Sequence, residues 1–105
     1  MTFTFLYVTA ENTLEAQQIS RHLLQKKLIA CANLFPVESV YKWQGKMVEA
    51  GEAVLILKTL KNKVEKIKKE IEKIHSYKIP CLTEIEVNPN EQYGKWLLEQ
   101  FKDKD

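Results

Sequence analysis

The sequence has few of the residues on which several familiar functional motifs depend. Its 105 residues include three glycines, two cysteines and one arginine, Arg21. The glycines Gly45, Gly51 and Gly94 are too scattered for a phosphate-binding loop, and the cysteines lack CxxC spacing. Because the planar fork of arginine is the usual reader of phosphate and guanine edges, a single arginine argues against nucleic-acid recognition.

Long apolar runs are also absent. No stretch approaches the roughly 18 apolar residues of a membrane-spanning helix, and residues 1–5 have neither the basic nor the apolar part of a signal peptide. The net charge of +2 is too small to indicate a polyanionic partner. We therefore expect a cytoplasmic protein with reduced cysteines and with neither a membrane nor a nucleic-acid partner. A chain that is 45% hydrophobic and 29% charged predicts one globular domain over residues 1–105.

What the sequence does contain is a long strand pattern from Cys31 to Trp43. This stretch is more than twice the usual strand length of about 5–6 residues. Pro36 lies in its middle, and since proline cannot donate to a ladder, the strand is expected at a sheet edge. An edge of this length that ends in Tyr41 and Trp43 would aggregate unless it were covered. In so short a chain, we expect the cover to be another copy of the chain.

Apolar periodicity predicts seven elements in the order β-α-β-β-α-β-α. The predicted strands are residues 2–9, 31–43, 53–57 and 81–87, with a hairpin connection at 44–51. Strands 2–9 and 53–57 are apolar on both faces, which places them in the middle of the sheet. The first six elements match a ferredoxin-like β-α-β-β-α-β sandwich of the α+β class, with strand order 4-1-3-2 and an extra C-terminal helix. Since both crossover helices cover one face, the other face stays apolar and exposed, which predicts an obligate oligomer.

Two helices are predicted to pack on the sheet. Asn12 followed by Glu15 has the pattern of a capping box at the start of the first helix. The residues of this helix expected in the core are Ala16, Ile19, Leu23 and Leu24. The apolar stripe of the second helix is Leu60, Val64, Ile67, Ile71 and Ile74. The stripe is too short for a coiled-coil seam, which favours helix-on-sheet packing. The opposite face, with Lys66 and Glu70 as an i,i+4 pair, is interpreted as solvated.

His75 is the first candidate for a functional residue. One interpretation is structural, because a protonated imidazole at the end of a helix suits the negative end of its dipole. The other is a copper or zinc ligand, with Cys81 or Glu84, of the same or a neighbouring subunit, as co-ligands. His22 has no partner ligand in the sequence and is interpreted as exposed or cap-side. Cys31 is interpreted as a buried small hydrophobe, on the sheet edge opposite Cys81.

Five segments carry a resemblance to a known family. They are LIACAN at 28–33, YKWQGK at 41–46, ILKT at 56–59, HSYKIP at 75–80 and YGKWL at 93–97. In this order they resemble the CutA family of divalent-cation tolerance proteins. The resemblance implies a cytoplasmic homotrimer of ferredoxin-like subunits, similar in build to the PII signalling proteins. It also implies a link to copper and other divalent metals, with no assigned catalytic activity and no organic cofactor.

The chain departs from that family at positions tied to metal. Ser76 replaces the proline of the family's His-Pro-Tyr motif, and Cys81 stands where a glutamate is usual. Some members have a cysteine, proposed as a copper ligand, where this chain has Val8, and a second histidine where it has Ile74. Of that proposed ligand set, only His75 is present.

A second candidate site is a cleft between subunits, lined by Trp43, Glu52, Lys58, Tyr77 and His75. Lys58 emerges from the end of an apolar strand, and Tyr77 lies in the loop that should pass near it. Polar residues that recur in the family fall at these positions. An ammonium beside a tyrosine hydroxyl and an indole edge suits a small anion or carboxylate. The alternative for Lys58 is a structural ion pair, or a lysine that extends along apolar surface to reach water.

These features predict a homotrimeric protein of divalent-cation tolerance that binds a metal ion or a small ligand and is not an enzyme. The alternative is a PII-like signalling module that senses a small anionic metabolite in an intersubunit cleft. Three other functions found on this fold are disfavoured by missing residues. A copper chaperone needs a CxxC in the loop at 10–13, an RNA-recognition domain needs aromatics on strand 53–57, and an acylphosphatase-like enzyme needs an arginine in the first loop.

Overall fold

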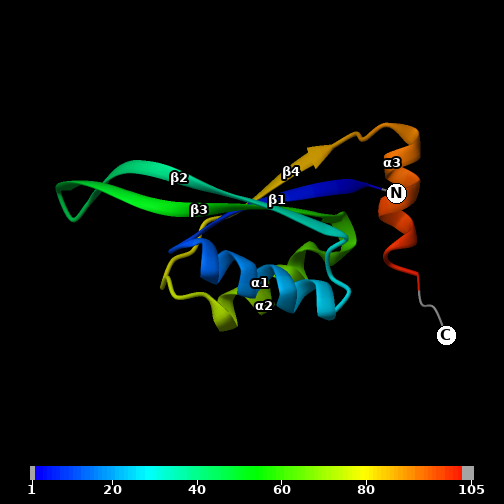
Figure 1. The fold of residues 1–105 in the computed structure, drawn as a ribbon, viewed down its shortest axis with the longest axis horizontal. Coiled ribbons are helices and arrows are strands. Elements are labelled where there is room, and N and C mark those ends of the chain that lie inside the picture. The colour runs from blue at the N-terminus through cyan, green and yellow to red at the C-terminus, as the bar shows by residue number, and fades with distance from the viewer. Residues whose placement is uncertain (1, 103–105) are drawn as a thin grey trace.

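The computed structural model describes residues 2–102, which form one four-stranded antiparallel sheet with three helices (Figure 1). The strands are β1 (Phe3–Ala10), β2 (Cys31–Trp43), β3 (Lys46–Leu60) and β4 (Leu82–Val87). The helices are α1 (Thr13–Gln25), α2 (Val64–Ile74) and α3 (Glu91–Glu99), with a 3-10 turn, η1 (Lys61–Lys63), before α2. The strand order β2-β3-β1-β4 confirms the predicted ferredoxin-like α+β fold, with β2 and β4 at the edges. None of the helices within residues 2–102 is both long and apolar enough to cross a membrane.

The two faces of the sheet differ in what covers them. Side chains such as Leu6, Leu55 and Leu57 are fully buried beneath α1 and α2, which lie on the same face (Figure 1). Because side chains alternate along a strand, the intervening residues point to the other face. On this open face Phe35 and Ile85 are 41% and 47% exposed. The apolar open face that the sequence predicts is therefore present in the single subunit.

Helix α3 packs at the end of the sheet where β1 starts (Figure 1). A Cβ atom on Gly94 would lie 3.2 Å from Cζ of Phe3, so the glycine permits a close approach of helix and ring. The Nζ of Lys58 donates to the Tyr93 hydroxyl at 3.1 Å and lies 5.1 Å from the centroid of the Tyr93 ring. It also lies 5.6 Å from the centroid of the Phe5 ring. The hydrogen bond and these cation–π contacts join α3 to the sheet.

The β2–β3 hairpin is longer than the sequence predicts. Its turn consists of Gln44 and Gly45 alone, whose φ angles of 51° and 79° are typical of a two-residue type I′ turn. The predicted connection over residues 44–51 is therefore wrong, because β3 starts directly after the turn and pairs with β2 from Lys46 to Lys58. Strand β1 reaches only as far as Ala53 of β3. Residues 37–52 thus form a two-stranded arm that projects beyond the sheet (Figure 1).

The start of α1 agrees with the sequence, but its core face does not. The Asn12 Oδ1 accepts a hydrogen bond from the Glu15 N–H at 2.9 Å, which is the predicted N-cap. The Glu15 carboxylate accepts from the N–H of Glu11 at 2.8 Å, one residue earlier than in a capping box. Leu24 is 44% exposed, so its predicted place in the core is wrong. Ser20 is buried instead, because its hydroxyl can donate to a carbonyl one turn earlier, at 2.8 Å.

Glu70 does not lie on a solvated face, contrary to the prediction. Helix α2 turns it toward α1, where it is 7% exposed. Its carboxylate pairs with Lys26 and His22, each at 2.9 Å, and with Lys73 at 3.2 Å, rather than with Lys66. Hydrogen bonds from Lys26, His22 and Lys73 lower the pKa of Glu70 to about 2. His22, predicted as exposed or cap-side, is a contact between the two helices.

Candidate functional site

A groove of about 580 Å³ lies where the arm leaves the sheet. It is lined by Thr9, Tyr41, Trp43, Val48, Glu52, Tyr77, Lys78, Ile79 and Cys81. The pairing register puts Tyr41 opposite Val48, on the face of the arm that also carries Trp43 and Glu52. The volume falls in the range of about 300–1,000 Å³ typical of small-molecule sites. Three predicted cleft residues, Trp43, Glu52 and Tyr77, are therefore brought together by the fold.

A hydrogen bond joins Tyr77 and Glu52, two residues that line the groove. The Tyr77 hydroxyl donates to Oε2 of Glu52 at 2.6 Å. Partial burial, and then the hydrogen bond to Glu52, raise the pKa of Tyr77 well above its usual range. The phenol therefore stays protonated at neutral pH and keeps donating to the carboxylate. Among residues 2–102, no lysine, arginine or histidine forms an ion pair with Glu52.

His75 uses both ring nitrogens to hold the loop that carries Tyr77. Its Nε2 lies 2.7 Å from the carbonyl oxygen of Thr9, and its Nδ1 lies 2.9 Å from the backbone nitrogen of Tyr77. A carbonyl oxygen can only accept and a backbone N–H can only donate, so Nε2 carries the proton and Nδ1 accepts. The ring therefore has no free lone pair for a metal ion in this arrangement. Its position at the C-cap of α2 agrees with a structural role, but a ring that accepts at Nδ1 is neutral, so hydrogen bonds rather than a charge at the helix dipole give it that role.

The beginning of α1 holds the same loop at a second point. The Oε2 of Glu15 accepts a hydrogen bond from the N–H of Ser76 at 2.8 Å. Burial raises the pKa of Glu15, but the N–H groups of Glu11 and Ser76 outweigh it, and the pKa is lowered overall. A charged Glu15 thus fixes the segment before Tyr77 at neutral pH.

Cys81 and Glu84 lie on opposite faces of the sheet. The Sγ of Cys81 is 3.5 Å from Oγ1 of Thr83, on the open face. Glu84 pairs in register with Leu6, whose side chain is buried beneath the helices. Because one metal ion cannot bridge both faces of a strand, Cys81 and Glu84 of one subunit cannot bind the same ion, so each remains an alternative co-ligand.

Glu84 is engaged by two lysines instead. Its carboxylate pairs with Lys61 and, at 3.1 Å, with Lys68. Lys61 first, and then Lys68, lower the pKa of Glu84. With both His75 nitrogens engaged as well, the residues of one subunit do not fit the predicted copper or zinc site. Within residues 2–102, no group of three His, Cys, Asp or Glu side chains is placed to hold a metal ion.

Lys58 does not line the groove, unlike Trp43, Glu52 and Tyr77 of the predicted cleft. Its Nζ binds the Tyr93 hydroxyl at the α3 end of the sheet. Lys78, which the sequence did not single out, supplies a cationic side chain at the groove, and it is exposed. Cys31 is partly exposed rather than buried, and it lies on the edge strand opposite the β4 edge, as predicted.

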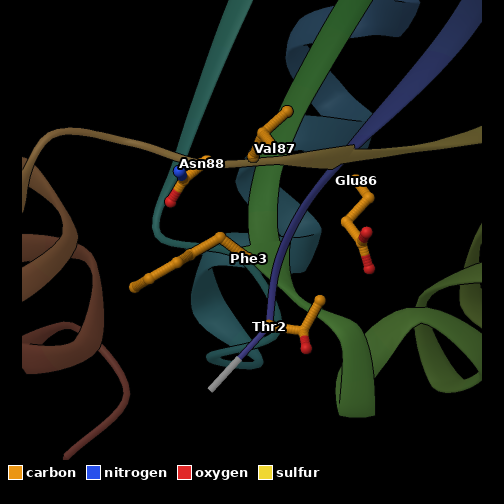
Figure 2. Close-up of a pocket in the computed structure, with 5 residues that line it drawn as sticks. All are labelled: Thr2, Phe3, Glu86, Val87 and Asn88. Carbon is orange, nitrogen blue, oxygen red and sulfur yellow. The ribbon is translucent and has the colours of Figure 1, made fainter.

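A second hollow of about 400 Å³ lies at the other end of the sheet. Figure 2 shows the residues that line it: Thr2, Phe3, Glu86, Val87 and Asn88. The Phe3 side chain extends toward α3, while Glu86 points away from it (Figure 2). Glu86 is the one ionisable residue of this lining, so the hollow lacks the paired polar groups found in the groove.

Sequence reasoning missed most of the apolar lining of the groove. The alternation pattern already puts Tyr41 on the face of Trp43, so Tyr41 could have been included. Val48 could not, because it fell within the predicted connection. Ile79 is 76% exposed and lies in a loop, where periodicity gives no signal.

Comparisons with known proteins agree with one another. A family model described as CutA1 divalent ion tolerance protein matches residues 4–100. The Divalent-cation tolerance protein CutA of Pyrococcus horikoshii is 39% identical over 98 residues, covering 92% of this chain and 96% of its own. The solved structure of the Periplasmic divalent cation tolerance protein CutA from Archaeoglobus fulgidus has a TM-score of 0.91 at 36% identity, covering 95% of this chain and 99% of its own. CutA1 from Oryza sativa has a TM-score of 0.92 at 27% identity, covering 99% of this chain and 97% of its own.

Proposed function

This chain belongs to the CutA1 divalent ion tolerance family, and on that premise we propose that it forms a homotrimer that binds a small ligand in its groove. The observation that carries the proposal is the hydrogen-bonded pair of Tyr77 and Glu52, which sets a carboxylate at the end of an aromatic-walled groove. Sites of this kind combine an apolar lining with a few fixed polar groups. The proposed role in divalent-cation tolerance is that of a binding protein and not of an enzyme.

The arm and the open face support an assembly. Trp43, Val40 and Met47 of the arm are 56%, 64% and 70% exposed. A two-stranded hairpin by itself is at best marginally stable in water, so the arm needs a further surface to cover it. The apolar open face, with Phe35 and Ile85, is such a surface on another copy. The number three comes from the resemblance to the CutA family.

A role in metal tolerance does not require this subunit to hold a metal ion through His75. The residues of one subunit do not assemble a ligand set, so direct binding of copper or zinc would need a site shared between subunits or a different arrangement of the His75 ring. Titration of the assembled protein with copper and zinc tests this directly. Stoichiometric binding that depends on Cys81 would support a shared site.

A PII-like sensor of a small metabolite is the second candidate function. The groove supports it, because it lies at the base of the arm, where a neighbouring copy would complete its walls. An anionic metabolite has less support as the ligand, since Lys58 binds the Tyr93 hydroxyl at the other end of the sheet and not in the groove. We also propose a cytoplasmic location, which the free thiols of Cys31 and Cys81 support and cell fractionation would test.

The proposed ligand function is tested by thermal denaturation of the full chain with a panel of amines, carboxylates, nucleotides, copper and zinc. A ligand that binds only the folded protein raises the melting temperature. Tyr77→Phe should reduce that gain, because it removes the hydroxyl at the groove. Tyr93→Phe is the matched control, since its hydroxyl lies with Lys58 and outside the groove. If no compound stabilises the wild type, the groove is structural and the proposal fails.

A further inference from the structure

The carboxylate of Glu52, in the groove, has hydrogen-bond acceptor capacity that is not used. Glu52 is partly buried, and it accepts one hydrogen bond, from Tyr77. A carboxylate has two oxygens with about four lone-pair sites, so most of its accepting capacity is open. Within residues 2–102, no cationic side chain pairs with it. A partly buried charge in such a place is stabilised by a cation, and a ligand can bring one.

The Tyr77 hydroxyl adds a second acceptor at the same point. Its proton is used in the bond to Glu52, so its oxygen lone pairs are free to accept from a further donor. An ammonium group has three donors and no acceptor, which matches one carboxylate oxygen and one phenol oxygen. A carboxylate ligand placed at this point would face the carboxylate of Glu52 and a Tyr77 hydroxyl whose proton is already donated.

The walls of the groove suit the apolar body of an amine. Tyr41 and Trp43 of β2 and Val48 of β3 line it on the face that carries Glu52. Aromatic rings attract cations through their faces and also cover apolar surface. Glu52 and Val48 are four residues apart on β3, which corresponds to about 13 Å at the rise of a strand. This length accommodates an ammonium at Glu52 and an aryl or alkyl chain extending toward Trp43.

Other occupants fit the same features less well. A small anion would depend on Lys78, which is exposed, since Lys58 is engaged at the far end of the sheet. A divalent metal ion would find a single carboxylate, because within residues 2–102 no group of three ligands is formed. A lysine from a neighbouring copy could also reach Glu52, and it would then block the site.

We propose that the groove binds a small organic cation, a primary amine with an aryl or alkyl body, whose ammonium is held by Glu52 and Tyr77. This rests on the proposed function of the groove as a ligand site. It replaces the anionic ligand class expected from the sequence, because the group that the fold places there is an acid.

The test compares three probes of similar shape on the full-length wild-type protein by isothermal titration calorimetry at neutral pH. They are 2-phenylethylamine, the neutral 2-phenylethanol and the anionic 3-phenylpropionate. The amine should bind at least about tenfold more tightly than the alcohol, because a charge-assisted hydrogen bond is lost in the alcohol. The carboxylate should bind most weakly of the three.

Two variants then locate the binding. Glu52→Gln keeps the shape of the side chain and should weaken the amine at least about tenfold, while leaving the alcohol unchanged. Glu49→Gln is the matched control, since Glu49 is an exposed acid on the same strand, opposite Val40 and on the other face of the arm. It should leave all three affinities unchanged.

The outcomes separate the ligand class from the ligand site. Equal or tighter binding of the alcohol or the carboxylate would overturn the cationic class and leave the groove as a ligand site. Tight binding of the amine that Glu52→Gln does not weaken would overturn the site. If none of the probes binds, the proposal that the groove binds an amine fails. The better explanation of the groove is then that a neighbouring copy of the chain fills it. Should Glu52→Gln fail to fold, the comparison of probes on the wild type still decides the class.

Discussion

Glu52 and Lys58 share strand β3 and one of its faces, yet their side chains have partners at opposite ends of the sheet. They are six positions apart, which is about 20 Å at the rise of a strand. Glu52 binds Tyr77 in the groove, and Lys58 binds Tyr93 of α3. The pair that the sequence suggested as one cleft is therefore one groove residue and one residue that anchors a helix.

Lys58→Met should loosen α3 and leave the groove intact. The substitution removes a hydrogen bond and two cation–π contacts, which together cost about 1–2 kcal/mol of stability. Hydrogen exchange of the α3 amides should become faster. Lys95→Met is the control, because Lys95 forms only an exposed pair with Glu91 at 3.3 Å and should change little. Loss of ligand binding in the groove in Lys58→Met would contradict this assignment.

His75→Ala should lower thermal stability without changing metal affinity. The loss of a donor to Thr9 and an acceptor for Tyr77 costs about 1–3 kcal/mol. His75→Asn should recover part of it, since the amide oxygen can take the place of Nδ1 as acceptor. Thermal denaturation measures the first effect, and calorimetric titration with zinc and copper measures the second. A tenfold fall in the affinity for either metal would restore His75 as a ligand.

Trp43→Asp should weaken the assembly. Trp43 lies on the arm that we propose is covered by another copy, and a charge there would be buried without a partner. Sedimentation equilibrium at micromolar concentration should give about three times 12.3 kDa for the wild type and a lower mass for the variant. Asn62→Asp adds the same charge at the exposed η1 turn and should remain a trimer. A folded wild-type monomer would refute the trimer.

Glu70→Gln should flatten the acid side of the stability curve. The pKa of Glu70 falls from 4.5 to about 2 on folding, so its contribution is complete above pH 4.5 and is lost as the pH falls toward 2. Urea unfolding at pH 7 and pH 3 should show a smaller difference for the variant than for the wild type. Glu72→Gln, at an exposed position of the same helix, should behave as the wild type does. If the stability of Glu70→Gln depended on pH as that of the wild type does, Glu70 would not be the source of the acid destabilisation.

Gly45→Ala should destabilise the hairpin, whereas Gly51→Ala should not. A Cβ atom at either position meets no other atom within 4 Å, so the two sites differ only in backbone conformation. Gly45 has a φ of 79°, where a side chain costs about 1 kcal/mol, while Gly51 lies within β3 and has no positive φ. Chemical denaturation of both variants measures the difference. Equal stabilities would mean that the arm adjusts its turn at no cost.

The order of the elements and the strand order follow from patterns that are local in the sequence. The bounds of β2, Cys31–Trp43, agree with the prediction. They could be predicted because the alternation of side chains and the effect of Pro36 on pairing both concern residues that are neighbours in the sequence. The arm beyond residue 43 was missed because Gly51 and the polar residues around it resemble a loop. A two-stranded ribbon without a core face does not need the apolar alternation that marks a strand.

Odd and even positions of a strand lie on opposite faces of the sheet, and the prediction of metal ligands did not take this into account. Cys81 is an odd position and Glu84 an even one, so a regular strand must send them to opposite faces. The same rule places Glu52 and Lys58 on one face, but it says nothing of how far apart their partners lie. Sequence proximity was therefore misleading for Cys81 and Glu84, and a shared strand face was misleading for Glu52 and Lys58.

The sequence by itself determined the fold class, the edge position of β2 and the family, since each depends on residue type and spacing along the chain. Only the tertiary structure decided the burial of Glu70 between two helices, the engagement of both His75 nitrogens and the place of Lys58 beneath α3. Glu70 and Lys58 depend on partners many positions away, and so does Nε2 of His75, which is separated from Thr9 by 66 positions, although the partner of Nδ1, Tyr77, is local. The charge of a group is set by its residue type, but its partner is set by which elements pack against it, and this packing is settled only when the chain folds.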